Sequence, residues 1–205
     1  MRLLESECQV DKFEEDIYED CYALGSEHNP AKFDLFVQWL YTRKYQEKEG
    51  LVEFPTSPAA VEYDSECLLF VSDGMVDWAV KAAILCWKLG ASLGAKGFQN
   101  YAMERLFEAL SRPLRRPLTV NLILHTYDIE NEEAFHGTSP LQRLIQDVIV
   151  RNWGDGEIVE HAAGETWSDL LEACPYFRKV FIEATSQSLE GRRKQQISLQ
   201  NYLIR

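Results

Sequence analysis

One stretch of the sequence constrains the fold more than any other: residues 33–45, which read FDLFVQWLYTRKY. An Asn29–Pro30 pair precedes it. Asparagine is a favoured N-cap, and proline suits the first helical position, where the backbone N–H has no helical partner. Five large apolar side chains then share the i, i+3, i+4, i+7, i+8 spacing of one helical face: Phe33, Phe36, Val37, Leu40 and Tyr41. The sequence therefore predicts a helix that begins near Pro30 and packs inward through this stripe.

A second face of the same predicted helix carries Leu35, Gln38 and Trp39. We therefore expect the helix to contact neighbours on two sides, with the second face as the place where an interface begins and with Trp39 itself in the core. Burying one large aromatic or aliphatic side chain contributes about 1.5–3 kcal/mol, so the stripe is chiefly a folding device.

The rest of the chain alternates helical apolar patterns with turn signals. Ser72 or Asp73 is expected to cap a helix that ends near Gly90, and Ser139–Pro140 is expected to open another. Further helices are predicted at 98–110, 119–127, 167–174 and 176–189, with a short strand at 51–54. These patterns predict a predominantly helical α+β fold with few short strands.

Shifts in composition divide the chain into four parts. Residues 1–21 form an acidic lead-in, and residues 22–111 form a core region, interrupted at 46–66 by an insertion with two prolines and a glycine. Residues 117–190 form a C-terminal helical extension. Residues 191–205 form a basic tail, which we expect to be a solvated face or a loose end.

The overall charge narrows the classes of partner. The formal net charge of the 205 residues is −12, which argues against general binding to nucleic acids, because phosphate backbones require a basic face. Five scattered cysteines without a CxxC pair fit a reducing compartment, so we expect the cytoplasm or the nucleus. Neither a signal peptide nor an apolar run long enough to span a membrane is expected.

The sequence shows no motif of a catalytic centre, such as GxSxG, HExxH or a glycine-rich phosphate loop. None of the four histidines has a second histidine or cysteine at the spacing of a structural zinc site, so we expect neither metal nor cofactor. An alternative hypothesis is a small hydrolase or transferase whose site combines distant residues, for example His125 or His161 with Cys174 and a carboxylate.

Three blocks of the chain resemble the BTB/POZ domain, in particular its fungal versions. The first matches a helix of the form P-x-x-F-x-x-F-x-x-W-L-Y-T-G-K, although Arg43 stands where the family has glycine. The second, 79–110, is similar to the family's helical hairpin, and the third, 119–153, to a fungal extension. The matching residues of the first block are Pro30, Phe33, Phe36, Trp39, Leu40, Tyr41, Thr42 and Lys44.

The resemblance implies a non-enzymatic protein–protein interaction module. The more specific expectation is a ubiquitin-ligase substrate adaptor or scaffold that binds a cullin. Family members carry a longer N-terminal portion with the usual dimer interface, whereas 32 residues precede Phe33 here. The oligomeric state is therefore left open, and a shortened, monomeric regulatory paralogue is a further hypothesis. The candidate binding residues that the resemblance and the helical faces indicate are His28, Asn29, Leu35, Gln38, Trp39, Tyr41 and Ser92.

Overall fold

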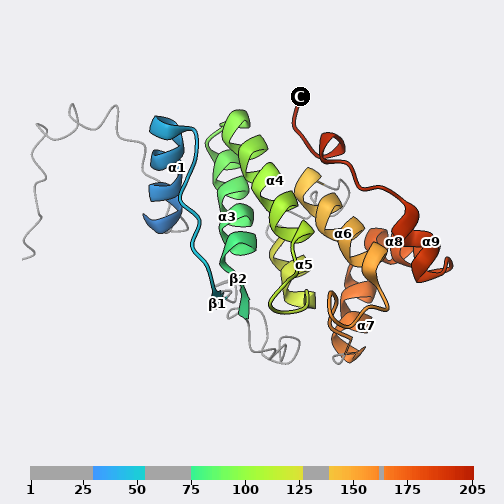
Figure 1. The fold of residues 1–205 in the computed structure, drawn as a ribbon. Coiled ribbons are helices and arrows are strands. Elements are labelled where there is room, and N and C mark those ends of the chain that lie inside the picture. The colour runs from blue at the N-terminus through green and yellow to red at the C-terminus, as the bar shows by residue number, and fades with distance from the viewer. Residues whose placement is uncertain (1–29, 54–74, 127–138, 162–163) are drawn as a thin grey trace, which may run out of the picture.

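The computed structural model describes residues 30–53, 75–126, 139–161 and 164–205 (Figure 1). This part of the chain is mostly helical with few short strands, as the sequence predicts, and the strands pair as a small two-stranded antiparallel sheet. The elements follow in the order α1 (Pro30–Thr42), β1 (Leu51–Glu53), β2 (Met75–Asp77), α3 (Trp78–Ser92), α4 (Lys96–Ser111), α5 (Val120–Thr126), α6 (Pro140–Asn152), α7 (Gly164–Ala173), α8 (Pro175–Thr185), α9 (Leu189–Lys194) and a 3-10 turn (Leu199–Asn201).

The α3–α4 hairpin lies at the centre of the fold, with α1 packed on one side and α6 on the other (Figure 1). Ile84 of α3 and Phe98 of α4 are fully buried in its core. The two helices approach closely at Gly90, where an added Cβ would lie 2.7 Å from Gln99 Cγ and 3.1 Å from Gln99 N. Glycine at this position therefore permits the spacing of the hairpin.

The small sheet corrects one predicted element. The strand predicted at 51–54 is confirmed as β1, and it pairs with β2 so that Val52 lies opposite Val76. The helix prediction that included Val76 is wrong there, because this residue belongs to β2 and the helix begins at Trp78. Its predicted caps, Ser72 and Asp73, lie outside the described residues. The pairing joins segments more than twenty residues apart, which a local helical pattern does not reveal.

The start of α6 confirms the local signal in the sequence. Ser139 Oγ accepts a hydrogen bond from Gln142 N at 3.2 Å, and Gln142 Oε1 accepts one from Ser139 N at 2.8 Å. This reciprocal capping box satisfies two backbone donors at the helix start, and Pro140 occupies the first turn. The helix then buries Leu144 and Ile145 completely.

The prediction of a loose end is wrong for the basic tail, because the tail packs on the structure, whereas a solvated face describes the exposed Arg193 and Lys194 correctly. Arg192 is only 6% exposed and donates hydrogen bonds to the backbone oxygens of Gln187 and Trp153. Beyond α9 the chain runs back beside α6 towards α4 (Figure 1). There Asn100 Nδ2 donates to Ile204 O at 3.0 Å, and Ile204 N donates to Asn100 Oδ1 at 2.8 Å.

Candidate protein-interaction surface

Helix α1 exposes one apolar face to solvent. Tyr41 is 86% exposed, Leu40 47% and Phe33 37%. The three residues stand at i, i+7 and i+8, which places them on one side of the helix. We call Phe33, Leu40 and Tyr41 the outer α1 surface.

The inner face of α1 carries a different set of residues from the predicted stripe. Leu35, Phe36 and Trp39 pack against the core. The rings of Phe36 and Trp39 have their centroids 5.0 Å and 5.2 Å from that of Phe98. The indole also lies against Gly97, where an added Cβ would be 3.4 Å from Trp39 Cη2. Trp39 is therefore a packing residue, as expected.

The predicted orientation of α1 is consequently wrong for Phe33, Leu40 and Tyr41, and right for Phe36. Both faces are apolar enough to be buried. The buried face is set by its fit to the hairpin, where the rings of Phe36 and Trp39 meet Phe98 and the indole also lies against Gly97.

Arg43 forms the turn that ends α1. Its φ of 60° lies in the left-handed region, and its backbone N–H donates to Trp39 O at 2.7 Å. The guanidinium lies over the Trp39 ring, with Cζ 5.1 Å from the centroid. The tight turn is thus made with arginine at the position where the resembling family has glycine, and the side chain interacts with the helix it follows.

The segment after this turn fastens α1 to the hairpin. Tyr45 is 6% exposed, and its ring centroid lies 5.3 Å from that of Tyr101. Glu47 forms an ion pair with Arg105 on α4, with Arg105 Nε 2.8 Å from Glu47 Oε1. Burial raises the pKa of the Tyr45 hydroxyl well above its usual range. The side chains of Tyr45 and Glu47 therefore hold the outer α1 surface in a fixed place on the molecule.

The structure separates the predicted binding residues. His28 and Asn29 lie outside the described residues. Gln38 has an internal role, because Nε2 donates to Asp34 Oδ2 at 2.9 Å and Oε1 accepts from Gln46 N at 3.1 Å. The exposed Ser92 hydroxyl donates to Leu89 O at 3.0 Å on its own helix.

Of the remaining candidates, only Tyr41 lies on the outer α1 surface, because Leu35 and Trp39 pack inward. Phe33 and Leu40 were not among the predicted binding residues. The sequence shows that they share a helix face with Tyr41, but the predicted stripe places that face in the core.

The residues of the alternative catalytic hypothesis are engaged in packing and hydrogen bonds where the structure describes them. His161 Nε2 accepts a hydrogen bond from Gly154 N at 3.0 Å, and the ring packs against Trp153 with centroids 4.6 Å apart. Cys174 is buried, and the side chain of His125 lies outside the described residues. Burial also raises the pKa of the Cys86 thiol to about 12, so the reactive thiolate is scarce at neutral pH.

Within the described ranges, no group of three or more His, Cys, Asp or Glu side chains is placed to hold a metal ion. Nor does any helix in these ranges combine the length and the apolar character needed to cross a membrane. The fold and the surface together define a predominantly helical α+β protein with an exposed apolar helix face. No protein-family model matches the chain, and neither does a curated protein or a solved structure.

Proposed function

We propose that the chain is a non-enzymatic protein–protein interaction module of the BTB/POZ type, and that the outer α1 surface receives the partner. The observation that carries the proposal is the exposure of three large apolar side chains on one helix face, with Tyr41 86% exposed. Exposed apolar residues grouped in this way are typical of protein contact sites, where aromatic side chains are also enriched.

The order of elements supports the family assignment. A helix with the P-x-x-F-x-x-F-x-x-W-L-Y-T pattern packs on a helical hairpin, and further helices follow. By this resemblance the partner is a cullin-type scaffold and the chain is a substrate adaptor, working in the cytoplasm or the nucleus. The rigid attachment of α1 through Tyr45 and Glu47 supports a docking role, because a fixed apolar face loses little conformational freedom when it binds.

The adaptor proposal is tested by direct binding to a purified cullin amino-terminal domain, measured by isothermal titration calorimetry. The test variant is Leu40→Ser/Tyr41→Ala, which removes exposed apolar area without opening the core. Trp39 is left intact because its replacement would disturb the packing on Phe98. The matched control is Tyr176→Ala/Ile182→Ser on α8, whose side chains are 48% and 60% exposed.

The α1 variant is expected to lose at least about tenfold in affinity, as when central interface residues are removed, whereas the control keeps its affinity. Absence of cullin binding by the intact chain would refute the adaptor assignment. The broader module is tested by affinity capture from a native extract with the same three baits. Proteins held equally by all three baits would refute the outer α1 surface as the binding site.

A further inference from the structure

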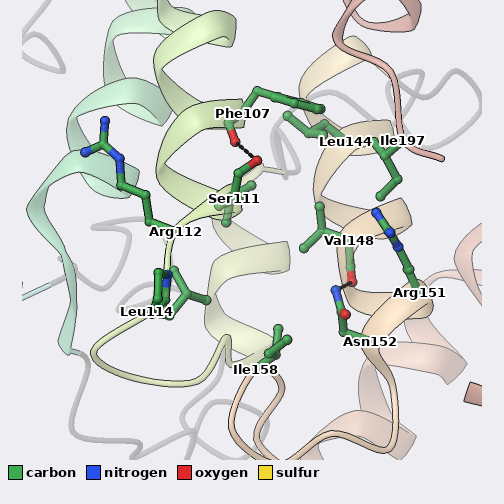
Figure 2. Close-up of a pocket in the computed structure, with 12 residues that line it drawn as sticks. Phe107, Ser111, Arg112, Leu114, Leu144, Val148, Arg151, Asn152, Ile158 and Ile197 are labelled. Atoms are coloured by element: carbon green, nitrogen blue, oxygen red, sulfur yellow. Dashed lines mark hydrogen bonds between the residues drawn. The ribbon is translucent and has the colours of Figure 1, made fainter. Parts of the chain in front are cut away.

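A groove of about 460 Å³ lies between α4 and α6 (Figure 2). It is on the far side of the hairpin from α1 (Figure 1). Leu144 and Val148 of α6 form its buried floor, and Phe107 of α4 and Leu114 after it form one wall. Ile158 and Ile197 close it from the loop after α6 and from the tail. The volume is within the range of about 300–1,000 Å³ that ligand sites occupy, and the lining is mainly apolar.

Two arginines, Arg112 and Arg151, line this groove from α4's end and from α6 (Figure 2). Arg112 lies 3.4 Å from carboxylate oxygens of both Glu47 and Glu108. Arg151 differs, because its recorded partner is a backbone oxygen, that of Arg193, at 2.9 Å. Within the described ranges it forms no ion pair. A half-buried guanidinium with unused donors beside apolar side chains is a site for a carboxylate.

The neighbouring surface of the same two helices already binds polypeptide. After Ile197, the tail continues along α6 and α4, where Tyr202 is 4% exposed and donates to Asp147 Oδ2 at 2.6 Å. Asn100 forms its two hydrogen bonds with the backbone of Ile204. The groove therefore adjoins a surface where side chains of α4 and α6 form hydrogen bonds with a separate segment of polypeptide.

From these observations we propose that the α4–α6 groove is a second docking site, which takes an acidic amphipathic segment of a partner protein. Apolar side chains of the segment fill the space over Leu144 and Val148, and a carboxylate pairs with Arg151. The proposal is independent of the outer α1 surface. A module with both surfaces would hold two proteins at once, one at α1 and one between α4 and α6.

The probe is a fluorescein-labelled peptide of sequence ELLEEFLEEL, and its charge-reversed counterpart is KLLKKFLKKL. Binding to the full chain is measured by fluorescence anisotropy. The chain is expected to prefer the acidic peptide, and Arg151→Gln to weaken that binding by about fivefold, as expected for a partly exposed charged pair. Ile197→Glu is expected to abolish it, because a second carboxylate would enter the groove beside Arg151. Arg178→Gln, on exposed α8, is the control for loss of one positive charge.

Circular dichroism spectra matching the intact chain show that each variant is folded. Equal affinities for the acidic and basic peptides would overturn the proposal, as would equal losses in Arg151→Gln and Arg178→Gln. Loss of binding in Leu40→Ser/Tyr41→Ala with retention in Ile197→Glu would also overturn it, because the peptide would then occupy the outer α1 surface. Retention in the α1 variant, with loss in Ile197→Glu, supports two separate surfaces.

Discussion

Arg43 allows a quantitative test of how α1 ends. Its φ of 60° costs a residue with a side chain about 1–2 kcal/mol, whereas glycine adopts this conformation without penalty. The contact of its guanidinium with the Trp39 ring offsets part of that strain, because an exposed cation–π contact stabilises by about 0.5–1 kcal/mol. The two contributions oppose each other, so a single substitution does not separate them.

Replacement by alanine and by glycine separates them, because both remove the cation–π contact and only alanine keeps the backbone strain. Arg43→Ala is expected to lower the free energy of unfolding by about 0.5–1 kcal/mol. Arg43→Gly is expected to be about 1 kcal/mol more stable than Arg43→Ala, because the relief of backbone strain exceeds the cost of glycine's greater freedom in the unfolded chain. For a chain of this length, 1 kcal/mol corresponds to roughly 2–4 °C in Tm.

The assay is urea unfolding followed by tryptophan fluorescence, to which Trp39 contributes directly, with thermal unfolding by circular dichroism alongside. If the alanine and glycine variants have equal stability, Arg43 is not held in the left-handed conformation and the reasoning fails. If Arg43→Ala is as stable as the intact chain, the cation–π contact contributes nothing measurable.

Two further predictions concern the hairpin and the tail. Gly90→Ala is expected to destabilise the fold by about 1–3 kcal/mol, because the new methyl group would meet both the side chain and the backbone of Gln99. The control in urea unfolding is Gly156→Ala, where an added Cβ meets nothing within 4 Å. Equal stabilities of the two variants would contradict the close approach of α3 and α4. Burial raises the pKa of Asp147 despite the hydrogen bond from Tyr202, so the folded state binds this proton more tightly than the unfolded state and its carboxylate penalises folding above the raised pKa. Asp147→Asn keeps a hydrogen-bond acceptor for Tyr202, so it is expected to be at least as stable as the intact chain at pH 7. The difference in unfolding free energy between the two should shrink towards pH 4. A variant that is less stable than the intact chain by the same amount at pH 7 and pH 4 would contradict the prediction.

The parts of the fold that were predicted correctly depend on neighbours in sequence. Ser139, Pro140 and Gln142 specify the start of α6 within four residues, and the structure contains the capping box those residues can make. The first helical position of α1, Pro30, also agrees with the sequence. Such signals are local, because the atoms that satisfy the first helical N–H groups belong to the same turn.

The parts that were predicted wrongly depend on residues distant in sequence. Arg192 belongs to a basic run that resembles a solvated end, yet it is buried because the backbone oxygen of Trp153, 39 residues earlier, accepts its hydrogen bond. Val76 fits a helical pattern, yet it forms a strand because Val52 is available to pair with it. Composition and periodicity carry no information about either partner.

The orientation of α1 joins this second group, and it changes the functional argument more than any other correction. With the predicted stripe inward, Tyr41 would be core and an interface would begin on the face of Leu35 and Gln38. The observed packing on Phe98 confirms Trp39 as a core residue and leaves Tyr41 exposed, so a Trp39 variant would report on folding and a Tyr41 variant on binding. A helical pattern with two apolar faces indicates a helix that packs against neighbours on both faces. It does not say which contact is with the protein itself, because that depends on the fit to Phe98 of the hairpin, 59 residues after Trp39.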